Sequence, residues 1–266
     1  MNCSRFLLTV KWDATSHRKD SLKLFFFIAF ALTVMFVIDM MEHRVRPALA
    51  DAAETLNGEY AGTALVFFCI MGMMYGLYAF GNMNPGRQRT AFLMLPASVA
   101  EKFAARCLWV SMGYALTFAA ALVVADALQM LIGLTLDPGP TGSAVVGLAE
   151  RCSSSFSGFV GYYAGLQGKG LYLTLACTWF LLMFLVLHAC LIAIGLLPGR
   201  WNKAVAILAV TAVVIIFDLF SVPYTIYGAH TARPVMMLAA ACVAETAAVA
   251  AVYALAYRTF SRMQIK

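Results

Sequence analysis

The chain has 266 residues, of which 62% are hydrophobic and 12% are charged, and its mean hydropathy is +0.82. Soluble domains carry about 25% charged residues, so this composition excludes an ordinary soluble protein and predicts an integral membrane protein. The net charge of +6 is expected to reflect topology and contact with anionic membrane lipid, and no nucleic-acid partner is predicted.

The first twenty residues precede any hydrophobic run, and their pattern predicts an amphipathic helix on the membrane surface. Apolar side chains on this helix would enter the lipid, and basic side chains would contact headgroups. The alternative is a disordered basic tail that only sets topology. The apolar residues are Phe6, Leu7, Val10 and Trp12, and the basic residues are Arg5, Lys11, Arg18 and Lys19.

Six later segments are long and apolar enough to cross a membrane, which requires about 20 residues in a helix. Their uninterrupted apolarity favours helices over barrel strands, which would alternate. The predicted fold class is therefore all-α: one polytopic transmembrane domain over 1–266 with six membrane-spanning helices. The predicted spans are 22–41, 60–82, 103–132, 171–197, 203–222 and 234–257.

Basic residues indicate the orientation of these spans. Most of the nineteen Lys and Arg residues fall in segments that share one side if the N-terminus is inside, and the opposite loops are richer in acids. The positive-inside rule then places both termini in the cytoplasm and predicts a multi-pass protein of the cell inner membrane. The inner residues are Arg5, Lys11, Arg18, Lys19, Lys23, Arg87, Arg89, Lys102, Arg106, Arg200, Lys203, Arg258, Arg262 and Lys266.

Residues 86–101 form an unusual connection between the second and third spans. Asn84-Pro-Gly86 is expected to end the second span, and a short apolar stretch follows. Ser98-Val-Ala-Glu101 has the spacing of a capping box, in which each side chain bonds the other residue's backbone N–H. The third helix should therefore begin before its hydrophobic part and act as a rigid extension of that span.

The longest outer connection, 135–170, begins with Asp137-Pro-Gly-Pro, which is expected to end the preceding helix. Its middle, 144–152, could form a short helix. The link between spans five and six, by contrast, is only about ten residues long. Either a plain loop or a broken, re-entrant helix fits this short link.

Four acidic residues lie in or near spans, where ionisable groups are costly and often functional. Asp39, Asp126 and Asp218 fall close to outer ends and should reach water, whereas Glu245 lies near the middle of span six. Glu245 either lines a pathway or is a hydrogen-bonded packing residue, with His188 or a tyrosine as its partner.

Span two contains Gly72-Met-Met-Tyr-Gly76, a spacing that permits close helix approach for packing or dimerisation. Tyr114 in span three belongs to a set of aromatic residues for which two roles stay open. They either line a pathway or pack in the core.

The chain carries no recognisable catalytic or nucleotide-binding motif, and its histidines and seven cysteines are scattered. We therefore expect no enzyme activity, no cofactor and no metal site in this chain.

The residues of the second connection resemble a known family. The order of basic N-terminal helix, two spans, basic insert and four further spans is similar to that of ABC-2-type transporter permeases. In particular, Leu95-Pro-Ala-Ser-Val-Ala-Glu-Lys-Phe103 is similar to a Leu-Pro-x-Ser-x-x-Glu-Lys-Phe pattern in such permeases from Bacteroidetes-like bacteria, and the tail beginning Tyr257-Arg-Thr-Phe fits the same group.

The resemblance implies that the insert is a coupling helix that docks on a cytoplasmic ABC ATPase subunit. It also implies a homodimer or heterodimer that exports a lipophilic or peptide-like substrate. Docking residues would be Phe92, Leu93, Leu95 and Pro96, supported by Arg87, Arg89, Ser98, Glu101, Lys102 and Arg106. The short link between spans five and six departs from the family, which often has two re-entrant helices there.

Three alternatives to this function stay open at the level of the sequence. The segment 86–106 could be merely a basic loop that sets topology. The protein could be a membrane scaffold or accessory protein without a transport cycle. It could also be an ion-coupled carrier that uses Glu245, with Tyr114 as a second possible pathway residue.

Overall fold

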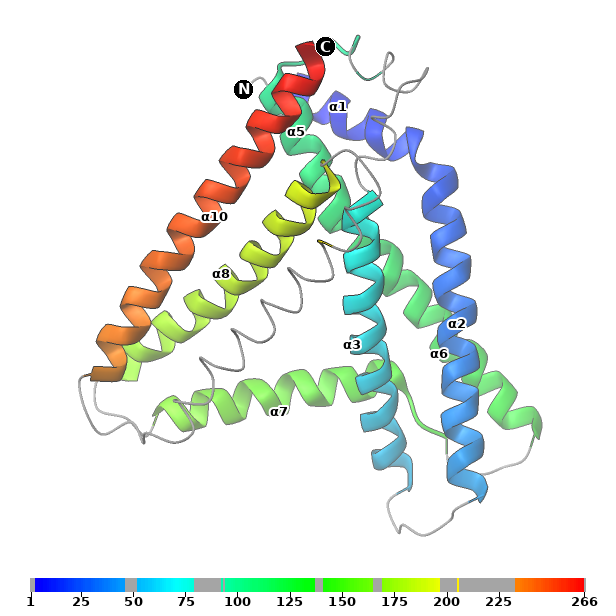
Figure 1. The fold of residues 1–266 in the computed structure, drawn as a ribbon. Helices are drawn as coiled ribbons and strands as arrows, with labels where there is room; N and C mark the ends of the chain where they lie inside the picture. The colour runs from blue at the N-terminus through cyan, green and yellow to red at the C-terminus, as the bar shows by residue number, and fades with distance from the viewer. Residues whose placement is uncertain are drawn as a thin grey trace. The chain divides into compact units, whose positions relative to one another are not determined.

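We analysed a computed structural model of the chain. It describes residues 3–45, 52–78, 92, 94–136, 141–164, 169–196, 205 and 233–265, and these residues are almost entirely helical, with no strand among them. Figure 1 shows the order of the helices along the chain. They are α1 (Cys3–Ser16), α2 (Arg18–Val45), α3 (Ala52–Tyr78), α5 (Val99–Leu108), a π-helical segment (Trp109–Gly113), α6 (Tyr114–Leu136), α7 (Ala144–Ala164), α8 (Lys169–Gly195) and α10 (Arg233–Ile265).

Four described helices are long and apolar enough to cross a membrane, so the chain is an all-α protein of the multi-pass membrane class. These stretches are Arg18–His43, Glu54–Gly76, Val99–Leu136 and Ala239–Arg262. They correspond to the first, second, third and sixth predicted spans. The fourth predicted span is helical as α8, and the fifth, at 203–222, lies outside the described residues except for Val205. Six spans and the orientation of the termini stay predictions.

The chain divides into two compact units, each of which is described by itself. Unit 1 contains Met1–Thr9, Met74–Cys107 and Phe159–Lys266, and unit 2 contains Val10–Met73 and Leu108–Gly158.

Unit 2 is built on the packing of α2 against α6, with the first part of α3 beside them. Phe36 of α2 packs on Tyr60 of α3 with ring centroids 4.8 Å apart. Tyr114 of α6 packs on Phe68 of α3, and its hydroxyl donates to the Phe68 carbonyl at 2.6 Å. Aromatic and backbone contacts therefore join α3 to both neighbours.

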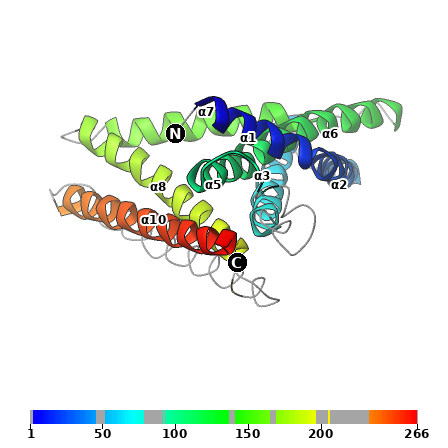
Figure 2. The ribbon, with the colours of Figure 1, turned by 90° about the horizontal axis from the view of Figure 1, so that it is seen from above.

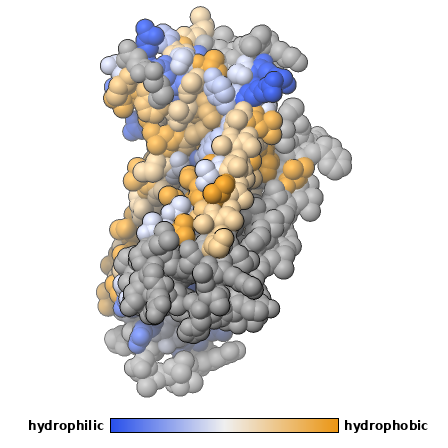
Figure 3. Space-filling model, turned by 90° about the vertical axis from the view of Figure 1, so that its left-hand side faces the viewer, coloured by the Kyte–Doolittle hydropathy of each residue, from blue (hydrophilic) through white to orange (hydrophobic). Residues whose placement is uncertain are grey.

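Unit 1 is built on α8 and α10, which lie side by side in Figures 1 and 2. His188 of α8 and Tyr253 of α10 share a hydrogen bond between Nδ1 and Oη at 2.6 Å. The Cys242 thiol of α10 also donates to the Leu175 carbonyl of α8 at 3.5 Å. In a space-filling view, hydrophilic residues gather at the end that carries the C-terminus, and hydrophobic residues cover much of the described surface below it (Figure 3).

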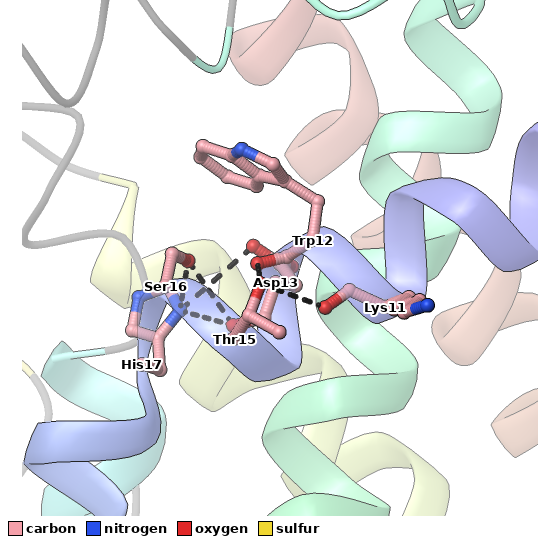
Figure 4. A network of polar contacts seen from close by, with 6 residues as sticks. All are labelled: Lys11, Trp12, Asp13, Thr15, Ser16 and His17. Atoms are coloured by element: carbon pink, nitrogen blue, oxygen red, sulfur yellow. Dashed lines mark hydrogen bonds and ion pairs between the residues drawn. The ribbon is translucent and has the colours of Figure 1, made fainter.

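The N-terminal helix is separate from the first span, because the chain turns at His17 between α1 and α2. Side-chain hydroxyls near the end of α1 bond carbonyls of the preceding turn (Figure 4), and the Asp13 carbonyl also accepts the His17 backbone N–H at 3.0 Å. Thr15 donates to the Lys11 and Trp12 carbonyls, and Ser16 donates to the Asp13 carbonyl. The predicted helix over the first twenty residues thus ends at Ser16, with Leu7 and Leu8 among its exposed side chains.

The third predicted span contains an irregularity that the sequence did not indicate. Helical structure runs from Val99 to Leu136, but Trp109–Gly113 is π-helical. Gly113 lies directly against the Trp109 ring, and a Cβ placed there would be 3.0 Å from it. The helix that the sequence predicts to be a rigid extension of the third span is therefore continuous, but its regular α-helical geometry is interrupted at this π-helical segment. Long helices often bend at such segments.

Candidate functional site

The segment between the second and third spans begins its helix where the sequence predicts. The Ser98 backbone N–H donates to Glu101 Oε2 at 2.9 Å, and the Glu101 backbone N–H donates to Ser98 Oγ at 3.3 Å. This reciprocal pair is a capping box, which confirms the predicted motif. The Glu101 side chain is only 3% exposed, whereas Ser98 is exposed, so the cap is buried on its Glu101 side.

The described residues just before the cap form a short turn. The Leu95 N–H donates to the Phe92 carbonyl at 3.4 Å, and the Ala97 N–H donates to the Leu95 carbonyl at 2.8 Å.

Phe92 faces inward and contacts the C-terminal part of α10. It is 1% exposed, and its ring centroid lies 6.1 Å from that of Phe260. Phe103 of α5 lies 5.5 Å from Phe260 and 5.7 Å from Tyr257 by the same measure. We call these four residues the aromatic cluster. Pairs at such distances contribute about 0.5–1.5 kcal/mol each beyond their area burial.

Two cations lie against the same cluster rather than in solvent. The Arg106 guanidinium carbon is 5.0 Å from the Phe92 ring centroid, and Lys102 Nζ is 5.9 Å from it. Both side chains are buried, at 1% and 4% exposure. A cation–π contact of this kind is worth up to about 2 kcal/mol when it is desolvated. Arg106 and Lys102 therefore contribute to the packing around Phe92, and their predicted role in supporting ATPase docking stays a prediction.

The outward side of the segment differs from the predicted docking set. Met94 is 79% exposed, Pro96 is exposed and Leu95 is half-buried. Phe92, predicted to dock, is instead covered by the aromatic cluster, because its ring finds an apolar partner at the far end of the chain. Met94, which was not among the predicted docking residues, is the exposed apolar side chain of this stretch instead. Arg87, Arg89 and Leu93 lie outside the described residues.

Glu245 pairs with a different residue from those predicted. It accepts a hydrogen bond from the Trp179 side chain on α8, while His188 bonds Tyr253. Its Oε2 atom is shielded and has no hydrogen-bond partner among the described residues. The hydrogen-bonded packing role and the pathway role both stay compatible with this geometry.

Tyr114 occupies a packed position, which corresponds to the core alternative left open by the sequence. It is 5% exposed and hydrogen-bonded to the Phe68 carbonyl. Gly72 allows this contact, because a Cβ there would lie 3.1 Å from the Tyr114 ring. Gly76 similarly lies against Leu191 of α8. The two glycines of the GxxxG pattern thus serve close packing within the chain.

Asp126 corrects a sequence expectation, because it is buried rather than open to water. The residue is 6% exposed, and its carboxylate binds the beginning of α7. Ser143 Oγ donates to it at 2.7 Å, the Ala144 N–H donates at 2.8 Å, and Gln129 Nε2 donates at 3.4 Å. A carboxylate at a helix N-terminus satisfies free backbone N–H groups and interacts well with the helix dipole.

The N-terminus of α7 is further fixed against α3. Asn57 Oδ1 accepts the Ser143 N–H at 2.6 Å, and Ser143 Oγ accepts the Val146 N–H at 3.2 Å. Gly147 has no room for a side chain, since a Cβ would overlap the Asn57 carbonyl. This junction of α3, α6 and α7 fixes where α7 begins, and the helix continues to Ala164, past the predicted residue 152.

Comparison with protein-family models, with curated proteins and with solved structures finds no match. The described residues also contain no group of three or more His, Cys, Asp or Glu side chains arranged to hold a metal ion. The described helices define the class of the protein, an all-helical multi-pass membrane protein.

Proposed function

We propose that this chain is the transmembrane permease subunit of an ATP-driven ABC exporter and that it works with a separate cytoplasmic ATPase subunit. In this proposal it forms a homodimer or heterodimer in the cell inner membrane and moves a lipophilic or peptide-like substrate. The ATPase docks on the segment 86–101, which we call the coupling segment.

One observation carries this proposal. The coupling segment exposes Met94 while burying Phe92, and it leads through the Ser98–Glu101 capping box into a helix that continues to Leu136. Met94 is an exposed apolar side chain on a segment whose opposite side is buried and which leads into a capped helix. Such a side chain is suited to insertion into a groove on a partner, since buried apolar anchors dominate binding energy. Displacement of that element would be passed into a membrane-spanning helix.

The chemistry of the chain supports a separate energy source. Its sequence contains no P-loop or other nucleotide-binding motif, so ATP hydrolysis is assigned to the partner. The Leu95–Phe103 pattern resembles that of ABC-2-type permeases, and this resemblance names the class of ATPase expected. The export direction follows from the same resemblance.

A second candidate, an ion-coupled carrier, is favoured by one feature. Glu245 lies within the stretch Ala239–Arg262, and its Oε2 has no partner among the described residues. A shielded carboxylate of this kind can carry a proton or bind a cation. In that case Glu245→Gln would abolish transport, whereas loss of any ATPase would leave transport unchanged.

The test is affinity purification of the tagged chain from native membranes, with Met94→Asp as the variant. We expect wild type to retain an ABC ATPase and Met94→Asp to lose it, because a charge cannot enter an apolar groove without a large desolvation cost. Leu8→Asp is the matched control, since Leu8 is 65% exposed and lies on α1, outside the four apolar stretches. Equal ATPase recovery from all three proteins would contradict docking at Met94.

Absence of any ATPase from the wild-type preparation would leave the scaffold and carrier hypotheses. Vanadate-sensitive transport separates the exporter from both of them, because neither alternative hydrolyses ATP through a partner.

A further inference from the structure

The C-terminal part of α10 contacts the coupling segment before its cap and α5 after it. Phe260 is fully buried, and its ring packs on Phe92 before the cap and on Phe103 after it. Tyr257 adds a second contact to Phe103. All of these residues belong to unit 1, so the contacts are internal to one compact body.

We infer that Phe260 and Tyr257 are positioning residues that hold the coupling segment in its docking orientation. This inference rests on the proposed function for its biological meaning. Its physical content is independent of that function, because it concerns only what fixes the segment in place.

The stretch before the cap is tied to its surroundings through the side chain of Phe92. The capping box fixes the start of α5, and Phe92 lies two residues before the exposed Met94. The Phe92 ring contacts Phe260 of α10 and the Arg106 guanidinium of α5. We therefore expect the outward orientation of Met94 to depend on the burial of Phe92.

The same face of α10 also reaches α8. Tyr253, Tyr257 and Phe260 follow each other at intervals of four and three residues, which places them on one side of a helix. Tyr253 bonds His188 of α8, Phe260 contacts Phe92 of the coupling segment, and Tyr257 contacts Phe103 of α5. One side of α10 thus contacts both the coupling segment and α8. A displacement of the coupling segment on docking can therefore reach α8 and α10 as well as α5 and α6.

The test is spin-label mobility at position 94 in the full-length protein reconstituted in lipid nanodiscs. The label is attached to Met94→Cys after replacement of the seven native cysteines. We expect Phe260→Ala to abolish the immobilised component of the spectrum, because Phe92 loses its ring contact with Phe260 and the stretch around it becomes mobile. Phe260→Leu should restore the immobilised component, since Leu keeps most of the apolar contact.

Leu255→Ala is the matched control, because Leu255 lies on the same helix but is 61% exposed. It should leave the spectrum unchanged. A label at Leu181 of α8, which is 60% exposed, reports on the rest of unit 1 and should not respond to Phe260→Ala. If Phe260→Ala mobilises both labels, the milder variant Tyr257→Ala replaces it. The inference then requires that Tyr257→Ala mobilise the label at position 94 and leave the label at Leu181 unchanged.

An immobilised label at position 94 in Phe260→Ala, with the Leu181 label also unchanged, would overturn the inference. That result would not affect ATPase co-purification with wild type. Conversely, failure to find an ATPase would remove the proposed function but leave the spectra to support or refute the positioning role.

Discussion

The guanidinium carbon of Arg106 lies 5.0 Å from the ring centroid of Phe92, and both side chains are 1% exposed. A cation at a buried position is costly unless it gains compensating contacts. This pair joins the first helix after the capping box to the turn before it. Its interaction energy therefore measures how firmly the coupling segment is held.

We predict a coupling energy of about 1–2 kcal/mol between Phe92→Leu and Arg106→Met in a double-mutant cycle. The free energy of unfolding is measured by detergent titration of the purified protein. The cycle of Phe92→Leu with Lys102→Met is the control, and its energy should be smaller because Lys102 lies 5.9 Å from the ring. Equal coupling energies in the two cycles would contradict a specific contact between the Phe92 ring and the Arg106 guanidinium.

Asp126→Ala should lower the free energy of unfolding by about 1–3 kcal/mol, because the Ser143 hydroxyl and the Ala144 N–H lose their buried acceptor. Amide exchange at Ala144 should accelerate, and mass spectrometry of peptides covering 141–150 measures this. The control is Glu150→Ala on the exposed side of α7, expected within about 0.5 kcal/mol of wild type. Unchanged exchange in Asp126→Ala would remove the capping role.

Gly147→Ala and Gly58→Ala should have effects of opposite sign on stability. A Cβ at Gly147 overlaps the Asn57 carbonyl, whereas a Cβ at Gly58 meets nothing within 4 Å. We expect Gly147→Ala to cost about 1–3 kcal/mol through overpacking. Gly58→Ala should gain about 0.5–1 kcal/mol from helix propensity. Thermal unfolding of the two variants tests both signs, and a stabilised Gly147→Ala would contradict the close approach of α7 to α3.

Tyr253→Phe should destabilise the α8–α10 pair by about 1–3 kcal/mol, since the His188 Nδ1 loses its hydrogen-bond partner. Combining it with His188→Phe should recover much of this loss, because replacement of both partners by apolar groups leaves nothing unsatisfied. Tyr257→Phe is the control and should stay within about 0.5 kcal/mol of wild type. Additive losses in the double variant would show that the two residues do not act as a pair.

Local features of this chain were predictable from sequence because their partners are neighbours. The capping box needs only Ser98 and Glu101, three residues apart, and α6 ends at Leu136 just before Asp137-Pro-Gly-Pro. The capping box also explains why α5 begins at Val99, directly after Ser98. Spans could be placed from hydropathy, although helices such as α3 begin several residues earlier than the apolar run.

Features that depend on distant partners were not predictable in this way. Phe92 was expected on the docking surface, and only its contact with Phe260, from the other end of the chain, reverses that expectation. Asp126 was expected to reach water, and its buried position depends on Ser143 returning from the outer connection. No periodicity in the sequence reports such pairings, since they arise from the tertiary arrangement.

Photo-crosslinking from position 94 in living cells tests the central claim most directly. A benzophenone amino acid replaces Met94 in one strain and the buried Phe92 in another, and mass spectrometry identifies the adducts. Docking through the exposed side of the coupling segment predicts an adduct between position 94 and an ABC ATPase, with none or far less from position 92. Adducts to lipid alone from position 94, in cells that contain the folded protein, would contradict the claim.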